Sequence, residues 1–436
     1  MRRSGVQESR SFAIGRTAVI SSIAMIVLLA AVASQAQTYQ VIHNFMGGLD
    51  GAEPTSGLTP DAAGNLYGTT FEGDALTGTV YKLTKKNSSW VLVPLYLFPY
   101  QGSGGSIPYA RVIIGNNGTL YGTAAFGGNL QGCSGGCGTV FNLRPSPSFP
   151  PTPLSPWIET PIYRFGGSDG ANPVGADLIF DQAGSIYGTT YNGGAGSCYG
   201  GCGTVYKLTP SDGSWTESVL YSFAQGGDGQ HPWGGVTFDQ SGNLYGTTVF
   251  GGAYGEGSIY ELTPAGSGWT ETILYSFTGG TDCANPYAGV IFDQAGNLYG
   301  ATVAEGAGNG GTAFELTPSG GSWTFNLLYS FTGAGGQFSA GPIANLAFDS
   351  AGNLYGTTHG DGAYTHGSVF KLTPGSDGWI HTSLYDFTGG TDGGYPRSSI
   401  LFDNNGNMYG TAAGGGTGDP DRCYGACGVI FEITPK

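Results

Sequence analysis

Short apolar segments alternate with stretches of Gly, Pro, Asn and Asp along most of the chain. Residues 290–331 show the pattern, with apolar segments at 290–292, 298–300, 312–317 and 323–331. These segments are rich in β-branched and aromatic residues and are bounded by turn residues, as strands are. None shows the 3.6-residue period of an amphipathic helix. We therefore expect four short strands in this unit, named A to D in chain order.

The same unit recurs along the chain. Leu-Tyr-Gly-Thr-Thr and its near-copies mark strand B seven times, roughly 56 residues apart, a spacing typical of repeat architectures. The repeat tyrosines are Tyr67, Tyr121, Tyr187, Tyr245, Tyr299, Tyr355 and Tyr409. Four antiparallel strands repeated seven times predict an all-β fold, a seven-bladed β-propeller with four-stranded blades. An open β array or two smaller sheets is the alternative.

The two ends of the chain favour a closed ring. The last repeat contains strands A, B and C but no D, whereas residues 39–45, ahead of the first repeat, resemble a D strand. We expect this segment to pair with residues 429–434, because that pairing completes the last blade and leaves few free sheet edges.

Two motifs predict local geometry. Asp-x-x-Gly-Asn joins strands A and B at 61–65, 181–185 (with Ser for Asn), 239–243, 293–297, 349–353 and 403–407, and Gly115 replaces the aspartate in the second repeat. It predicts a tight hairpin with a G1-type bulge. Strand D carries Trp-x5-Tyr at Trp90/Tyr96, Trp157/Tyr163, Trp215/Tyr221, Trp269/Tyr275, Trp323/Tyr329 and Trp379/Tyr385. Because six is an even spacing, we expect both rings on one face of the strand, packed between blades.

Residues 1–36 have the features of a secretory signal peptide. Four arginines lie between positions 2 and 16, an apolar stretch covers 17–32, and small residues end at Ala36. We expect cleavage near Gln37, one propeller domain over 37–436, no membrane span in the mature chain, and a secreted or periplasmic location. The alternative is an uncleaved N-terminal anchor.

Charge limits the choice of partners. Removal of residues 1–36 takes away four basic residues and one acidic residue, which changes the net charge from −15 to −18. Nucleic acid and anionic membranes are poor partners for such a surface. The 82 glycines among 436 residues belong to turns and loop tips, because the aromatic content of 13% and the periodic pattern indicate a packed fold.

The cysteines fall into three C-x-x-x-C pairs, Cys133/Cys137, Cys198/Cys202 and Cys423/Cys427, each between strands B and C. In an exported protein the simplest interpretation is three local disulfides. Metal binding and free thiols are the alternatives for these six. Cys283 lies outside the three pairs.

Antiparallel blades place the B–C and D–A loops on one face of the propeller. The D–A loops carry aspartates in a Gly-Gly-x-Asp context or a close variant of it, at Asp50, Asp169, Asp228, Asp282 and Asp392, each followed by a proline. His231 and Trp233 lie on the same face. Loops on a rigid scaffold often bind ligands, so these seven residues are the candidate ligand-binding residues. The competing interpretation is that the aspartates are Asx-turn caps and His231 a solvated loop residue.

Catalytic motifs are absent from the sequence, which contains no Gly-x-Ser-x-Gly, no His-Glu-x-x-His and no phosphate-binding loop. A calcium-dependent propeller hydrolase would need Asp, Glu and Asn near the starts of the A strands. The positions there are small: Ser56, Ala110, Ala176, Gly234, Ala288, Ala344 and Ser398. We therefore expect no catalytic residues, no metal and no other cofactor, with Ca²⁺ as the ion to test.

Leu-Tyr-Gly-Thr-Thr, followed by Gly-Thr-Val-Tyr-Lys-Leu-Thr-Pro (203–210) and Leu-Tyr-Ser-Phe (220–223), resembles the bacterial GloVer tandem repeat of the choice-of-anchor proteins. The resemblance covers the chain after residue 36 and implies an exported, propeller-like protein, with no catalytic residues to carry over. Members often end in a surface anchor. Residues 433–436 show none, so the resemblance implies release or periplasmic retention.

These observations predict a non-catalytic binding or surface-interaction propeller, with glycans as the leading ligand class. We expect a monomer whose partner is a polysaccharide or a cell-surface protein. The alternative is a carbohydrate-active or lactone-hydrolysing enzyme that assembles its site from several blades. A cluster of Asp, His and Trp233 at the channel rim would favour the enzyme, and an aromatic groove would favour the binding protein.

Overall fold

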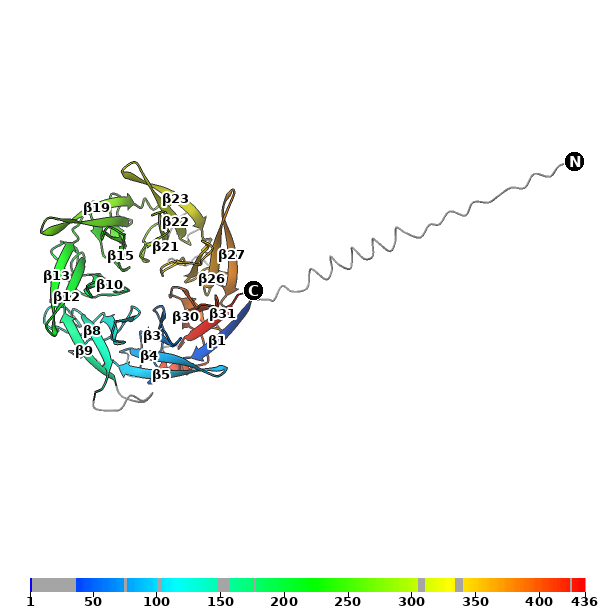
Figure 1. The fold of residues 1–436 in the computed structure, drawn as a ribbon, viewed down its shortest axis with the longest axis horizontal. Coiled ribbons are helices and arrows are strands. Elements are labelled where there is room, and N and C mark those ends of the chain that lie inside the picture. The colour runs from blue at the N-terminus through cyan, green and yellow to red at the C-terminus, as the bar shows by residue number, and fades with distance from the viewer. Residues whose placement is uncertain are drawn as a thin grey trace.

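The chain forms a seven-bladed β-propeller, in which small antiparallel sheets surround a central axis (Figure 1). This computed structural model describes residues 1, 37–73, 77–99, 103–147, 157–175, 177–304, 310–333, 340–423 and 426–435. The predicted signal segment, apart from Met1, lies outside them. In these ranges the one helical element is a 3-10 turn, η1 (Pro420–Arg422). None of the described residues belongs to a helix long and apolar enough to cross a membrane.

Each blade has the predicted four strands, A to D from the axis outward. Blades 1 to 3 contain β2 (Thr59–Pro60), β3 (Leu66–Thr70), β4 (Thr79–Lys86), β5 (Ser89–Leu97); β6 (Ile113–Ile114), β7 (Leu120–Ala124), β8 (Thr139–Pro145), β9 (Trp157–Arg164); β10 (Ile179–Phe180), β11 (Ile186–Thr190), β12 (Thr204–Ser211), β13 (Ser214–Ser222). Blades 4 to 6 contain β15 (Thr237–Phe238), β16 (Leu244–Thr248), β18 (Ser258–Ala265), β19 (Gly268–Ser276); β20 (Ile291–Phe292), β21 (Leu298–Thr302), β22 (Thr312–Ser319), β23 (Ser322–Ser330); β24 (Ala347–Phe348), β25 (Leu354–Thr358), β26 (Ser368–Gly375), β27 (Gly378–Asp386).

Blade 7 closes the ring as predicted. Its strands are β29 (Leu401–Phe402), β30 (Met408–Gly414), β31 (Val429–Thr434) and, from the other end of the chain, β1 (Thr38–Asn44). Strand β1 pairs antiparallel with β31, so the first and last strands lie side by side (Figure 1). Short loop strands β28 (Gly394–Pro396), β14 (Gly229–Gln230) and β17 (Phe250–Gly251) complete the list.

The predicted A–B hairpins are present, and their aspartates hold them. Asp61 Oδ1 accepts hydrogen bonds from the amides of Ala63 and Asn65, and Oδ2 accepts from the Asn65 amide group and the Tyr67 hydroxyl. Burial raises the pKa of Asp61, but these hydrogen bonds outweigh it and the pKa is lowered. Gly64 supplies the positive φ of 79° that the turn requires. The hairpin aspartates are therefore structural.

The glycine of Leu-Tyr-Gly makes room for an aromatic ring. Gly188 lies opposite Tyr206 in the neighbouring strand, and a Cβ on Gly188 would come within 2.5 Å of the Tyr206 hydroxyl oxygen. Tyr206 is fully buried. The same pairing recurs as Gly246/Tyr260 and Gly300/Phe314. A side chain larger than glycine at this position would expel the ring that fills the blade.

The hydrophobic core consists of seven clusters, one at each interface between neighbouring blades, which we call a seam. The prediction that the Trp and Tyr of strand D share a face is wrong. Trp215 packs in the seam between blades 2 and 3, whereas Tyr221 packs in the seam between blades 3 and 4. A β-bulge is the reason: Val205 pairs with Tyr221 and Tyr206 with Val219, so Leu220 is an extra residue that reverses the alternation. Both rings pack between blades, as expected, but in different seams.

Candidate functional site

The D–A and B–C loops interlock on one face of the propeller, as predicted. In blade 3, Ala171 of the D–A loop forms a β-bridge with Asn192 of the B–C loop, and Ala52 pairs with Glu72 in the same way. Each D–A loop also sends an amide to the B–C loop of the preceding blade, as in the hydrogen bond from His231 N to Cys202 O. The loops therefore form one hydrogen-bonded ring around the axis.

A pocket lies at the axis on this face. Its volume is about 80 Å³, smaller than a typical small-molecule site, so a ligand bound here lies partly outside it. In six blades the residue that follows the D–A proline lines it: Thr55, Tyr109, Trp233, Tyr287, Ile343 and Arg397. Blade 3 has one additional residue in this loop and contributes Gly175 and Asp177 instead.

Small residues line the pocket, and an ion pair holds one of its two charged residues. Five of the seven small residues named at the A-strand starts line it, namely Ser56, Ala110, Gly234, Ala288 and Ala344; Ser398 does not, and Ala176 lies outside the described residues. Arg111 Nε lies 2.7 Å from Asp177 Oδ2, and Asn345 Oδ1 accepts a hydrogen bond of 2.7 Å from the Gly289 amide. Asp177 and Asn345 therefore already have protein partners.

In five of the seven blades the first threonine of the Leu-Tyr-Gly-Thr-Thr motif fixes the pocket wall; blade 5 has Ala301 at this position, and Thr123 of blade 2 has no hydrogen-bond partner in the described part of the chain. Thr247 Oγ1 donates to the carbonyl of Ala288, 2.7 Å away in the next blade, and Thr189 Oγ1 donates to that of Gly234 at 3.0 Å. Thr411 closes the series by donating to Ser56. These threonines are buried, so their hydrogen bonds are shielded from water. The repeat motif thus holds the pocket backbone from one blade to the next.

In six of the seven blades the residue before the D–A proline has an unusual backbone conformation. Glu53, Ile107, Asn172, His231, Asn285 and Tyr395 all have φ between 51° and 60°. Positive φ is uncommon for residues other than glycine, and it is a true outlier for β-branched Ile107. The interlocked loop hydrogen bonds impose this conformation. It stores strain next to the residues that line the pocket.

One half of the site is aromatic. Trp233 is half-buried and makes edge contacts with Tyr109, Tyr191 and Tyr287, at ring-centroid distances of 5.9, 5.6 and 5.3 Å. Its indole nitrogen covers Gly175, where a Cβ would lie only 2.0 Å away. Blade 3 therefore needs glycine at this point to seat the tryptophan.

The other half carries charge. Glu53 interacts electrostatically with Glu72 and with Arg397 of the pocket wall, although neither glutamate lines the pocket. Burial, helped by repulsion from Glu72 and opposed by Arg397, raises the pKa of Glu53 to about 7. Burial also raises the pKa of Glu72. Burial and the Arg397 charge lower the pKa of His359 to about 4, so this imidazole is neutral at physiological pH.

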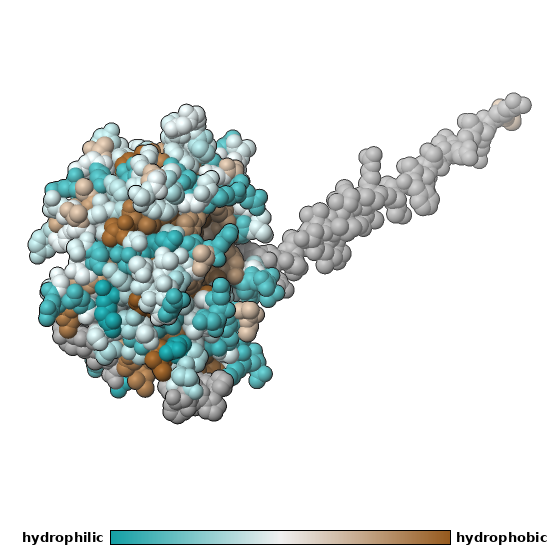
Figure 2. All heavy atoms as spheres, turned by 60° about the vertical axis from the view of Figure 1, so that its left-hand side comes forward, coloured by the Kyte–Doolittle hydropathy of each residue, from teal (hydrophilic) through white to brown (hydrophobic). Residues whose placement is uncertain are grey.

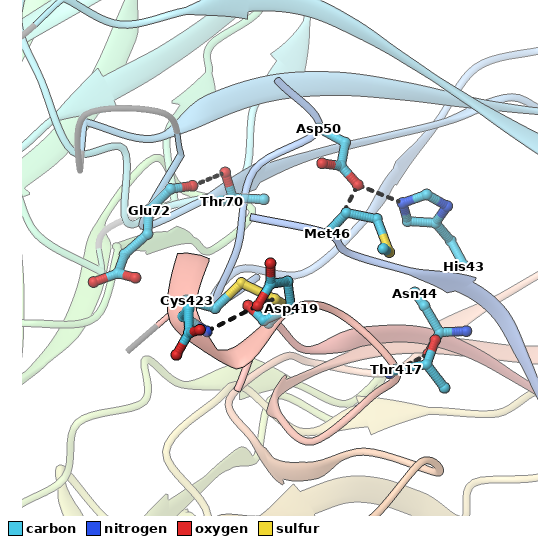
Figure 3. The surroundings of a disulfide bond; sticks show 11 residues. His43, Asn44, Met46, Asp50, Thr70, Glu72, Thr417, Asp419 and Cys423 are labelled. Atoms are coloured by element: carbon cyan, nitrogen blue, oxygen red, sulfur yellow. Dashed lines mark hydrogen bonds and ion pairs between the residues drawn. A yellow bond between two sulfur atoms is a disulfide. The ribbon is translucent and has the colours of Figure 1, made fainter. Parts of the chain in front are cut away.

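The five predicted aspartates act as turn caps in this structure. Asp282 Oδ2 accepts from the Thr278 amide and the Tyr275 hydroxyl, and Asp169, Asp228 and Asp392 make equivalent bonds. Figure 3 shows the Asp50 carboxylate directed at the Met46 amide and the His43 ring. None of the five lines the axial pocket. Their role in ligand binding stays a prediction.

Of the two other candidates, one lines the pocket and one does not. Trp233 is part of its wall. His231 is stacked on Tyr191 with a centroid distance of 4.6 Å, and its Nδ1 lies 2.8 Å from the Tyr191 carbonyl oxygen. His231 is therefore a supporting residue behind the wall.

Four residues of this region were not predicted from the sequence: Tyr109, Tyr287, Arg397 and Glu53. An alignment of the loops on their prolines would have found three of them, because each of Tyr109, Tyr287 and Arg397 directly follows such a proline.

Three disulfides join the predicted cysteine pairs, Cys133–Cys137, Cys198–Cys202 and Cys423–Cys427, and all lie in B–C loops. Cys283 is buried. Among the described residues no three His, Cys, Asp or Glu side chains are grouped closely enough to hold a metal ion.

Three solved structures illustrate what this chain is similar to. A protein assigned as a glucose dehydrogenase-type oxidoreductase of Thermus thermophilus has 14% identity and a TM-score of 0.43, with 91% of this chain and 100% of that one covered. One assigned as a 6-phosphogluconolactonase of Bacteroides uniformis has 14% and 0.48, with 76% and 83% covered. A Dyadobacter fermentans protein of unknown function has 12% and 0.41, with 91% and 97% covered. These similarities support no argument about activity.

No curated protein matches the sequence. The model of the Gloeobacter/Verrucomicrobia repeat matches three overlapping regions, residues 28–200, 102–279 and 196–424. These matches span nearly the whole propeller and confirm the resemblance stated on the repeat motif. The chain belongs to the Gloeobacter/Verrucomicrobia repeat family.

Proposed function

We propose that this protein is a carbohydrate-binding propeller that takes a saccharide into the axial pocket. The observation that carries the proposal is the aromatic wall, in which Trp233 stands between Tyr109 and Tyr287. A pyranose ring has one face of C–H groups, and that face packs well on the electron-rich face of an aromatic ring. The polar groups around the rim then serve the sugar hydroxyls.

Rigidity supports a binding role. The pocket backbone is fixed by buried threonine hydrogen bonds and by interlocked loops. A site that is already formed loses little conformational entropy when it binds a ligand. The backbone of the pocket wall therefore needs little rearrangement when a ligand binds.

A glycan array followed by calorimetry tests this proposal. We expect Trp233→Ala to weaken the best saccharide about tenfold or more, because the stacking surface is lost. Tyr254→Ala is the matched control, since Tyr254 is an exposed aromatic residue on a B–C loop outside the pocket. Equal binding by wild type and Trp233→Ala, or no binding of any glycan, would refute the proposal.

A second candidate is a carbohydrate-active or lactone-hydrolysing enzyme. Glu53 and Glu72 favour it, because two neighbouring carboxyl groups with raised pKa values are suited to proton transfer. Turnover of lactones and of aryl glycosides that stops in both Glu53→Gln and Glu72→Gln, while saccharide binding continues, would establish it. Binding without turnover by the wild type favours the binding protein.

We further propose a monomer that acts outside the cytoplasm on a polysaccharide or a cell-surface protein. Three disulfides are compatible with that location. Figure 2 shows hydrophobic residues in separate patches on the visible face, as is usual for a monomer. Cell fractionation, mass determination in solution and sequencing of the mature N-terminus test these points.

A further inference from the structure

Arg397 is the charged residue in the pocket wall that has no ion-pair partner. The wall contains two charged residues, Asp177 and Arg397, and Asp177 is paired with Arg111 at 2.7 Å. Among the described residues, no carboxylate oxygen lies within 4.0 Å of the Arg397 guanidinium, and its buried Nε has no hydrogen-bond partner. A guanidinium in the pocket wall without an ion-pair partner is free to pair with an acceptor on a ligand, and such a charge-assisted pair adds affinity.

The neighbours of Arg397 show the same deficit. Thr55 Oγ1, Glu72 Oε2 and His359 Nδ1 are also buried and lack hydrogen-bond partners in the described part of the chain. They belong to blades 1, 6 and 7, which adjoin one another in the ring, and Arg397 interacts electrostatically with His359 and Glu53. Two of these unsatisfied polar atoms, Thr55 Oγ1 and Arg397 Nε, belong to residues of the pocket wall, and the other two belong to B–C loops of the same face.

The chemistry of these groups indicates a carboxylate as the missing partner. A guanidinium presents parallel N–H donors that match the two oxygens of a carboxylate. The site has one arginine and two nearby carboxyl groups, so it suits a singly charged anion better than a doubly charged phosphate. The raised pKa values of Glu53 and Glu72 lessen the repulsion that an incoming carboxylate would meet.

The position of Arg397 relative to Trp233 defines the rest of the ligand. Trp233 enters the pocket ahead of blade 4 and Arg397 ahead of blade 7, so three blades separate them in a ring of seven. Because both residues line the same pocket, a single ligand can contact both. We propose that the ligand is a hexuronate-containing saccharide, whose carboxylate pairs with Arg397 while a ring face packs on Trp233. This inference rests on the proposed saccharide-binding function and specifies its ligand class.

Calorimetry with matched saccharides tests the inference. The probes are di- and trisaccharides of galacturonate, glucuronate and mannuronate, their methyl esters, and the corresponding neutral sugars. We expect a free acid to bind about tenfold or more tightly than its own ester, because only the acid forms the charge-assisted pair. Arg397→Gln should remove that preference, and Arg397→Lys should restore part of it. Arg422→Gln, an exposed arginine on the same face, is the control.

The outcomes separate this inference from the function on which it rests. If the esters and neutral sugars bind as tightly as the acids, and Arg397→Gln changes nothing, the pocket binds saccharides but the acidic ligand is wrong. Tighter binding of phosphorylated or sulfated sugars than of uronates would also overturn it. If Trp233→Ala binds every probe as the wild type does, the proposed function fails as well.

Discussion

The two halves of the propeller ring use different residues at the same position of their seams. In every seam from 1/2 to 6/7, a strand-D tyrosine faces a residue of the next blade's D strand. On one half that residue is Glu159, Glu217 or Glu271. On the other half it is Phe325, His381 or Tyr39, stacked on the tyrosine at 4.6, 4.3 and 3.7 Å.

The aspartate of the turn is common to both halves. Asp228 accepts from Tyr221 beside Glu271, and Asp282 accepts from Tyr275 beside Phe325. The turn therefore forms whichever residue lies opposite. The difference shows that the cap and the seam contact are separate: the first is required by the loop, and the second is open to variation.

The consequence of the difference is electrostatic. Burial and the Asp169 charge raise the pKa of Glu217 to about 7, and burial and the Asp228 charge do the same for Glu271. Burial, opposed by Arg164, raises the pKa of Glu159 to about 7. The folded state thus holds protons on these groups that the unfolded chain releases near pH 4.5. The stability that these protonated glutamates contribute is fully present below that pH and is lost as the pH rises towards and through 7.

The largest effect should come from placing a carboxyl group in a seam of the half of the propeller whose seams contain stacked rings. We expect Phe325→Glu to destabilise the protein at pH 7.5 by about 3 kcal/mol, because aromatic area is lost and a charge is placed beside Asp282. At pH 5 the loss should be smaller. Urea unfolding at both pH values measures this. Phe325→Gln is the control without a charge, and an equal loss for Glu at both pH values would contradict the comparison.

A smaller effect should follow when the native carboxyl groups are neutralised. The triple change Glu159→Gln, Glu217→Gln and Glu271→Gln should stabilise the protein at pH 7.5 by about 2 kcal/mol relative to pH 5, after allowance for the solvent that reaches these groups. The reason is that the variant has no seam carboxylates to deprotonate. If the unfolding free energies of variant and wild type change equally with pH, these glutamates do not titrate as proposed.

The smallest effect should distinguish the cap from the seam contact. Asp228→Asn and Asp282→Asn should each cost about 1 kcal/mol, because each cap loses charge-assisted hydrogen bonds. Only Asp228→Asn should also lower the pKa of a neighbouring glutamate, Glu271, since its charge is one cause of the raised value. NMR titration of the glutamate side-chain carbons checks this, and an unchanged Glu271 would remove Asp228 from the account.

The sequence by itself determined the blade and the ring. Short strands, the Asp-x-x-Gly-Asn hairpins and the spare strand at residues 39–45 depend on neighbours in the chain or on repeat number, so the pattern is sufficient to predict them. It also predicted which loops share a face, because antiparallel strands alternate in direction. The opposite faces of Trp215 and Tyr221 escaped prediction, because one bulged residue, Leu220, reverses the alternation and has no signature of its own.

Only the tertiary structure decided the axial site. Trp233 and Arg397 are 164 positions apart in the sequence, yet both line one pocket because seven loops converge on the axis. Glu53 and Arg397 interact only because the ring closes. The repeated sequence motifs specify the contacts that each repeat makes with the next one. The identity of the site depends instead on residues that differ between repeats, and their meeting point is set by the closure of the whole ring.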